Sequence, residues 1–232
     1  MPPIVNASGI SKQFGLTPLF KNISITVSEG DRIGLIGPNG SGKSTLLGIL
    51  SGRIEPDSGD VAIRKRTRMS FVAQISEFAP EETVGSVIAK ALEPPGVPME
   101  VRAQKQSEIA GRAGFMDFSV KADSLSGGWK KRLAIVQALV QQPDVLMLDE
   151  PTNHLDLAGI QWLESVLKNA ACACVVVSHD RYLLENVALD VVELNRVYSD
   201  GLLRVKGSYS TFLEAKDAYL HAQGKYQEAL AN

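Results

Sequence analysis

The sequence predicts an α/β protein with a mixed, largely parallel sheet, an antiparallel layer beside it and an inserted helical subdomain. Three observations carry this prediction. Short strand-like runs with turns fill residues 3–35, and a glycine-rich loop then separates a strand from a helix. Helical patterns occupy residues 80–122. After residue 123, apolar strand-like runs alternate with helices, which is typical of strands buried on both faces of a parallel sheet.

The first 79 residues are expected to hold several strands and one helix. The helix follows the glycine-rich loop, runs from about Lys43 to Leu50 and is stopped by Gly52. The closely spaced early strands indicate an antiparallel layer. The expected strands are IVNASGI, NISITV, DRIGLIG, the end of EPDSGDVAI, and RMSFVAQ, the last of which ends at Gln74.

The middle of the chain is expected to form the helical insert and then return to the core. TVGSVIAKAL and MEVRAQKQSEIAGRAG are read as helices of the insert, and a helix from Lys130 to Gln141 follows the turn LSGG. DVLMLDE and CACVVVSHD are read as buried strands joined by the crossover helix AGIQWLESVLKN. The predicted domains are a core of residues 1–79 and 123–208, an insert of residues 80–122 with the motif at 125–132, and a last segment of residues 209–232.

The last segment carries apolar residues at alternating steps of three and four, which is typical of a coiled-coil-like helix. The stripe consists of Phe212, Ala215, Tyr219, Ala222, Tyr226 and Ala229. It is still in phase at Asn232, so we expect a helix that continues in a longer protein. The alternative is a terminal helix packed on its own domain.

Composition excludes several classes of protein. The chain has 232 residues, a net charge of −2 and 44% apolar residues, so no overall basic field points to nucleic acid or membrane. No apolar run reaches the length of a membrane span, and we see no signal peptide. Cys172 and Cys174 are the only cysteines and are poorly spaced for a disulfide. A cytoplasmic protein is expected.

The loop GPNGSGKS fits the pattern G-x-x-x-x-G-K-[ST] between a predicted strand and a predicted helix, the context in which this pattern binds phosphates. Lys43 is expected to reach the terminal phosphates, and the Ser44 hydroxyl to bind Mg²⁺. The expected nucleotide-binding residues of the loop are Gly37, Pro38, Asn39, Gly40, Ser41, Gly42, Lys43, Ser44 and Thr45.

Polar residues at the ends of other strands are candidates for the chemistry. Asp149 ends an apolar run and is expected to hold Mg²⁺, and Glu150 is expected to take a proton from the attacking water. Gln74 is a candidate for contact with metal or water, although most such residues are solvated. A lone histidine is more often structural than catalytic, but His179 is expected at the same end of the sheet as Asp149 and Glu150, which makes it a candidate site residue. Phe14 is read either as an adenine-stacking ring or as a core residue.

A second glycine turn, LSGG at residues 125–128, opens another helix, and such a turn also binds anions. The set GPNGSGKST, Gln74, LSGGWKKR, VLMLDE and SHD resembles the ATP-binding-cassette ATPases. LDEPTNHLD and VVVSHDRYLL resemble the ABC-F branch, whose members lack transmembrane domains. The short insert looks most like the Uup-type members, and GSYSTFLEAKDAYL resembles the start of their inter-cassette linker.

This resemblance implies a role for each matching residue. Phe14 would stack on adenine, Gln74 would sense Mg²⁺ and the γ-phosphate, Glu150 would be the general base, and His179 would contact the γ-phosphate. The turn of Ser126, Gly127 and Gly128 would cap the γ-phosphate held by a facing cassette. Asp156 would belong to the loop that crosses to that cassette. Trp129 replaces the glutamine commonest in transporters and leaves this capping undisturbed in principle.

The resemblance also sets the expected partners. These are ATP with Mg²⁺, a second cassette in the same longer chain or in a homodimer, and the ribosome or nucleic acid, with no membrane subunit. The alternatives are a transporter subunit and a nucleotide-gated binding module with slow hydrolysis. The basic stretch of Arg64, Lys65, Arg66 and Arg68 is a candidate RNA contact, but a solvated strand end is favoured.

Overall fold

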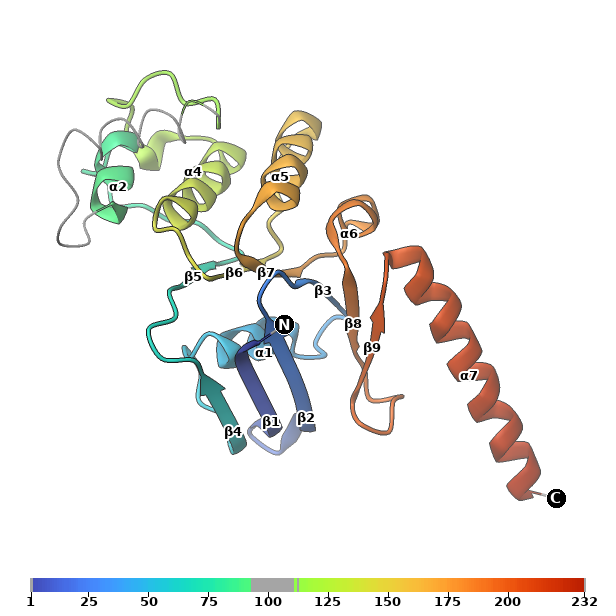
Figure 1. Cartoon of the computed structure of the whole chain (residues 1–232). Coiled ribbons are helices and arrows are strands. Elements are labelled where there is room, and N and C mark those ends of the chain that lie inside the picture. The colour runs from blue at the N-terminus through green and yellow to red at the C-terminus, as the bar shows by residue number, and fades with distance from the viewer. Residues whose placement is uncertain (1, 93–110, 112, 232) are drawn as a thin grey trace.

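A six-stranded sheet forms the centre of the computed structural model, which describes residues 2–92, 111 and 113–231 (Figure 1). The strand order is β5-β6-β7-β3-β8-β9, and only β9 runs antiparallel to its neighbour. Every residue of β6, β7 and β8 is buried, as the apolar runs predict for β6 and β7; the sequence analysis named no strand at β8 or β9. The strands are β3 (Arg32–Ile36), β5 (Met69–Val72), β6 (Val145–Asp149), β7 (Ala173–Val177), β8 (Asp190–Leu194) and β9 (Leu202–Lys206).

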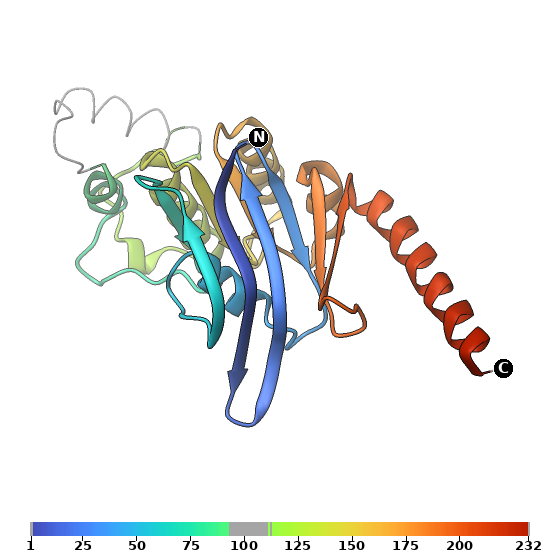
Figure 2. The same cartoon turned by 60° about the horizontal axis from the view of Figure 1, so that its bottom comes forward.

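A three-stranded antiparallel sheet lies beside it (Figure 2), in the order β2-β1-β4. Its strands are β1 (Pro3–Phe14), β2 (Thr17–Ser28) and β4 (Ser58–Ile63). Ile23, Ile25 and Val27 are buried and alternate with more exposed residues, so one face of this sheet joins the core. β1 and β2 extend beyond the expected runs because they pair along a long hairpin as far as Phe14 and Thr17.

Helices cover both faces of the six-stranded sheet. On one face, α1 (Lys43–Leu50) packs in a common core with the antiparallel sheet. The opposite face carries α4 (Gly127–Val140), α5 (Leu157–Asn169) and α6 (Arg181–Val187) (Figure 1). Residues that alternate along β6 and β7 supply the two cores, so each strand is buried on both sides.

A separate apolar cluster joins the insert to α4. α2 (Val84–Ala91) begins at a capping box formed by Thr83 and Ser86, and the short 3₁₀ helix η1 (Ala122–Ser124) follows later. Buried residues of α2 pack with Leu133, Val136 and Val140 of α4. Most of the second helix predicted in the insert lies outside the described residues.

Two further predicted boundaries were wrong. α4 begins at Gly127 and not at Lys130, because Ser126 takes the extended conformation of an N-cap and both glycines are already helical. β5 ends at Val72, so Gln74 lies beyond the strand. The carbonyls of residues 73 and 74 bond to a side chain of α4 instead of a neighbouring strand.

The C-terminal helix α7 (Tyr209–Ala231) begins directly on the domain. Phe212 is buried against Ala188 and Val191, and Lys216 forms an ion pair with Glu193 of β8 at 2.9 Å. The rest of α7 projects away from both sheets (Figures 1 and 2). In the described part of the chain, no helix is both long and apolar enough to cross a bilayer.

Candidate functional site

The glycine-rich loop joins β3 to α1, as predicted. Gly37, Gly40 and Gly42 all have positive φ, which lets the backbone curl around one centre. The Lys43 ammonium lies inside this curl and donates hydrogen bonds to the carbonyls of Gly37, at 2.9 Å, and Pro38, at 3.1 Å. Burial lowers the pKa of Lys43, and the nearby charges of Glu150 and Asp149 oppose this shift.

The start of the loop also presses against β8. A Cβ atom on Gly37 would lie 2.4 Å from the carbonyl oxygen of Leu194, so only glycine fits here. The oxygen belongs to the main chain of a central strand and cannot move aside without disturbing the sheet. The first residue of the phosphate loop is therefore fixed against the end of β8.

The carboxyl ends of β3, β6 and β7 meet at one sheet edge. Val177 pairs with Asp149 of β6 and with Leu35 of β3, so the segments after these strands come together. The Ser44 hydroxyl donates to Oδ1 of Asp149 at 3.1 Å. A hydroxyl beside a carboxylate fits a hard cation such as Mg²⁺, which prefers oxygen ligands.

Glu150 follows Asp149 in a left-handed turn with φ of 46°, and its amide donates to the carbonyl of Val177 at 2.9 Å. Such a conformation is uncommon outside glycine and clusters at functional sites. Oε1 of Glu150 lies 3.3 Å from Nε2 of His179, and the His179 amide donates to Oε2 at 3.3 Å. Burial raises the pKa of Glu150, and His179 and Lys43 partly offset this.

Lys43, Ser44, Glu150 and His179 line one cleft of about 620 Å³, whereas Asp149 is not among the lining residues and contacts Ser44 behind it. Gln74 and Phe14 also reach it, and the Phe14 ring is 60% exposed, so Phe14 is not a core residue. Of the predicted residues, Phe14, Asn39, Gly40, Gly42, Lys43, Ser44, Thr45, Gln74, Glu150 and His179 line the cleft. The sequence did not single out four further lining residues as site residues, Leu19, Thr152, Asn153 and Asp180.

The sequence profile of the ABC transporter family matches residues 20–153, which is more than half of the chain. The chain belongs to this family, as an ATP-binding cassette. The predicted resemblance to ATP-binding cassettes is therefore confirmed at the level of the family.

Two curated relatives and one solved structure resemble the cassette. The uncharacterized ABC transporter ATP-binding protein YfmR of Bacillus subtilis is 35% identical over 97% of this chain and 41% of that protein. The energy-dependent translational throttle protein EttA of Escherichia coli K12 is 33% identical over 91% of this chain and 44% of that protein. The cassette thus spans less than half the length of either relative.

A dimeric post-hydrolysis state of the cassette MJ0796 with ADP and Pi matches with a TM-score of 0.75 and 26% identity, over 87% of this chain and 98% of that one. The predicted fold class is confirmed.

The signature turn, which we define as Ser126, Gly127 and Gly128, lies apart from the cassette's own cleft. None of its residues is among those that line the cleft, and Ser126 and Gly127 are exposed. The turn packs against His154, whose φ is 70°. A Cβ on Gly128 would lie 2.5 Å from the carbonyl oxygen of His154. An exposed helix N-terminus is a suitable anion site, and no residue of this turn lines the cleft beside the phosphate loop.

An aromatic cluster supports this turn, and sequence reasoning missed most of it. The guanidinium of Arg132 lies over the rings of Trp129, at 4.9 Å, and Trp162, at 5.5 Å. Trp129 also packs edge-to-face on Phe115. Arg132 pairs at 3.4 Å with Asp156, the N-cap of α5. Asp156 therefore contacts the signature helix and does not line the cleft.

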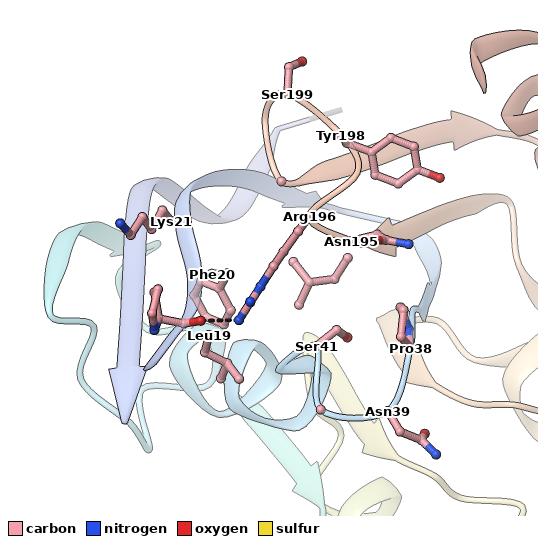
Figure 3. Close-up of a pocket in the computed structure, with 14 residues that line it drawn as sticks. Leu19, Phe20, Lys21, Pro38, Asn39, Ser41, Asn195, Arg196, Tyr198 and Ser199 are labelled. Atoms are coloured by element: carbon pink, nitrogen blue, oxygen red, sulfur yellow. Dashed lines mark hydrogen bonds between the residues drawn. The ribbon is translucent and has the colours of Figure 1, made fainter. Parts of the chain in front are cut away.

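A second cavity of about 610 Å³ lies on another side of the phosphate loop (Figure 3). It is bounded by the loop, the start of β2 and the turn between β8 and β9. The Arg196 guanidinium crosses it and donates to the carbonyl of Pro18 (Figure 3). Asn39 and Gly40 line both cavities, so the phosphate loop forms the wall between them.

Part of the basic stretch forms ion pairs within the cassette. Arg64 pairs with Glu29 at 2.5 Å, and Arg68 approaches Asp144 at 3.6 Å. Arg66 has a positive φ of 64°, which places it in a turn. These contacts support the interpretation of a solvated strand end over an RNA-binding surface.

Proposed function

We propose that the chain is an ATP-hydrolysing cassette of a soluble, cytoplasmic ABC-F protein. Its closure on a second cassette would act on the translation or nucleic-acid machinery. The motifs at 148–156 and 175–184 support the ABC-F assignment, as does similarity to EttA, which is named a translational throttle protein. The Uup-type assignment rests on the short insert alone. The observation that carries hydrolysis is the Glu150–His179 pair beside Lys43 in one cleft.

The cleft supplies distinct groups for each part of Mg-ATP. The backbone amides of the phosphate loop and the Lys43 ammonium hold the phosphates, and Phe14 stacks on the base. Ser44, Asp149 and Gln74 would supply oxygen ligands to Mg²⁺. When bound, the ion neutralises charge on the phosphate oxygens.

Glu150 is the general base of this proposal. Its carboxylate accepts a proton from the attacking water, and its raised pKa brings it closer to the working pH. His179 holds the carboxylate through two contacts and presents its ring to the γ-phosphate. The left-handed turn at Glu150 keeps this carboxylate beside the ring instead of extending along β6.

The position of the signature turn supports head-to-tail pairing. Because it does not reach its own cleft, it is free to cap the γ-phosphate held by a facing cassette, in the same longer chain or in a homodimer. Asp156 lies beside this turn through Arg132 and would approach the same interface. Two cassettes would then enclose two ATP molecules, each bound by residues of both.

The test is ATP hydrolysis and oligomeric state in Glu150→Gln. Removing a general base should lower turnover by about 10²- to 10⁴-fold while ATP still binds. Light scattering should show a dimer only with Mg-ATP, because blocked hydrolysis traps the closed pair. Glu81→Gln, at an exposed carboxylate outside the cleft lining, is the matched control. Unchanged turnover in Glu150→Gln would contradict the proposed base.

Ser126→Arg tests the pairing separately. Binding of ATP to the monomer should be unaffected, because Ser126 does not line the cleft. Cooperative hydrolysis should be lost, because the arginine would obstruct the facing γ-phosphate. Cooperative hydrolysis that survives this change would refute the head-to-tail arrangement.

The two alternatives have distinct signatures. For a transporter subunit, a membrane protein should copurify with the longer protein. For a nucleotide-gated binding module, ATP should close the pair while turnover stays slow and insensitive to ribosomes. A strong rise of turnover with ribosomes supports the proposed role in translation over both.

A further inference from the structure

The second cavity, on the other side of the phosphate loop, is not used by the proposed chemistry. Its volume of about 610 Å³ is close to that of the nucleotide cleft, and both lie in the range of small-molecule sites. Three segments that are far apart in the sequence enclose it, namely the phosphate loop, the start of β2 and the turn between β8 and β9 (Figure 3). The fold therefore leaves room for a second small molecule beside the nucleotide.

The charged side chains in the lining of this cavity are cationic. Among the described lining residues, Arg196 and Lys21 carry positive charges and none carries a carboxylate. The Lys21 side chain points away from Arg196, whose guanidinium crosses the cavity (Figure 3). Arg196 donates to the neutral carbonyl of Pro18, and no carboxylate in the described part of the chain pairs with it. Its remaining N–H groups are suited to a carboxylate, sulfonate or phosphate.

The turn that carries Arg196 is held by its own hydrogen bonds. Oδ1 of Asn195 accepts from the amide of Val197 at 3.2 Å. The Tyr198 hydroxyl donates to the buried Glu193 carboxylate at 2.5 Å. Arg196 thus projects from a turn that is already ordered, so a ligand that binds to it pays less to fix the backbone.

The wall formed by the phosphate loop adds further polar groups. Oγ of Ser41 is buried and has no hydrogen-bond partner within the described residues. An unsatisfied hydroxyl of this kind carries a cost that a bound acceptor would remove. Asn39 is exposed and lines the same wall. A ligand rich in acceptor atoms would therefore find donors on the loop as well as on Arg196.

Much of the remaining lining is apolar and comes from Leu19, Phe20, Pro38 and Leu194. Inorganic phosphate alone would leave this apolar surface uncovered. A guanidinium stacks on aromatic faces and also pairs with anionic groups, so the lining favours a ligand that has both features.

We propose that the second cavity is a binding site for a small aromatic anion, a ring system that carries a carboxylate, sulfonate or phosphate. The anionic group would bond to Arg196, and the rings would lie against the apolar lining. The phosphate loop separates this site from the nucleotide cleft, so both ligands would bind at once. This inference goes beyond the proposed function and does not depend on hydrolysis.

The experiment uses two probes that differ only in charge. Anilinonaphthalene sulfonate has an aromatic body with one anionic group, and its emission rises in apolar surroundings. Phenylnaphthylamine is the same ring system without the sulfonate. Both are titrated into the 232-residue chain with the nucleotide cleft filled by Mg-ADP, whose binding is measured separately by calorimetry. Arg196→Met is compared with Arg66→Met, which removes the same charge from an exposed turn residue outside the cavity lining.

We expect the sulfonate probe to bind wild type and Arg66→Met with similar affinity while Mg-ADP is bound. Its affinity for Arg196→Met should be about ten- to a hundredfold lower, because a hydrogen bond to a charged group is lost. Phenylnaphthylamine should bind all three proteins alike, because it has no anionic group for the guanidinium.

Two results would overturn the proposal: no binding of the sulfonate probe to wild type while Mg-ADP is bound, or equal affinity for wild type and Arg196→Met. A chain that does not bind Mg-ADP would instead contradict the proposed function, and the same titrations without nucleotide would then test the cavity. If Arg196→Met does not fold, Arg196→Gln removes the charge and keeps a donor for the Pro18 carbonyl. It should show the same selective loss of the sulfonate probe, and an undiminished affinity would refute the site.

Discussion

Replacing Gly128 with alanine should destabilise the cassette, whereas the same change at Gly127 should be nearly neutral. At Gly128 the new Cβ would lie 2.5 Å from the carbonyl oxygen of His154, and real Cβ contacts are essentially never under 3.0 Å. That oxygen is main chain, and His154 is already held at a φ of 70°, so it has little freedom to turn away. At Gly127 the nearest atoms lie 3.3 Å away, in the exposed His154 side chain.

The magnitude follows from two opposing effects. Overpacking of this kind costs about 1–3 kcal/mol. Alanine in place of glycine in a helix returns up to about 1 kcal/mol. For Gly128→Ala the net loss should be about 1–2 kcal/mol, which lowers the melting temperature of a chain of this size by roughly 2–8 °C. For Gly127→Ala the propensity gain and a small repacking cost nearly cancel, and the net change should stay within about 1 kcal/mol.

The assay is thermal unfolding followed by circular dichroism, with both variants and wild type measured side by side without nucleotide. The order of melting temperatures should place Gly128→Ala lowest, with Gly127→Ala close to wild type. A Gly128→Ala variant that melts at or above Gly127→Ala would refute the reasoning, since the close approach to His154 would then carry no cost. Calorimetry should show unchanged ATP affinity in both, because neither glycine lines the cleft.

Three further predictions concern the cleft and α7. The hydrolysis rate should fall as the pH drops through the pKa of Glu150, because the base must be deprotonated. Burial raises this pKa above its ordinary value of about 4.3, so a pH–rate profile should show the fall above about pH 4.3. A rate that stays unchanged down to about pH 4.3 would contradict the prediction. Phe14→Ala should weaken ATP binding about 2- to 10-fold in calorimetry, from loss of stacking worth about 0.5–1.5 kcal/mol, with stability unchanged; equal affinity would remove Phe14 from the site. Lys216→Met should cost about 1–2 kcal/mol in urea unfolding at pH 7, because it takes a partner from the nearly buried Glu193. Burial alone would raise the pKa of Glu193, but hydrogen bonds from Tyr198, Lys216 and other donors lower it, so this difference should vanish as pH falls below that native pKa.

The sequence predicted those parts of the site that follow directly from a strand. The phosphate loop, Asp149 and His179 each come just after an apolar run, and parallel strands end at one edge, so their meeting could be foreseen. The roles assigned to these residues remain predictions. The helix over residues 43–50 was confirmed at both ends, because the loop and Gly52 mark them clearly.

Contacts between distant segments could not be foreseen. Lys131 shares a helix face with the buried Ile135 and Ala138, but its bonds go to carbonyls nearly sixty residues earlier, and a local pattern does not specify such partners. The stacking of Arg132 between two tryptophans depends on how α4 and α5 pack, which periodicity does not specify. The docking of Phe212 and Lys216, with the ring contact between Tyr219 and Tyr198, partly supports the alternative that the last helix packs on its own domain.

The end of strand β8 contacts both the phosphate loop and the C-terminal helix α7. Gly37, where the phosphate loop begins, presses on the carbonyl of Leu194, and the preceding residue, Glu193, holds Lys216 of α7. The 23 residues of α7 make a rod about 35 Å long. A tilt of roughly 5° at its base would move its far end by about 3 Å. Because β8 contacts both the phosphate loop and α7, any tilt of the base of α7 would displace its far end most.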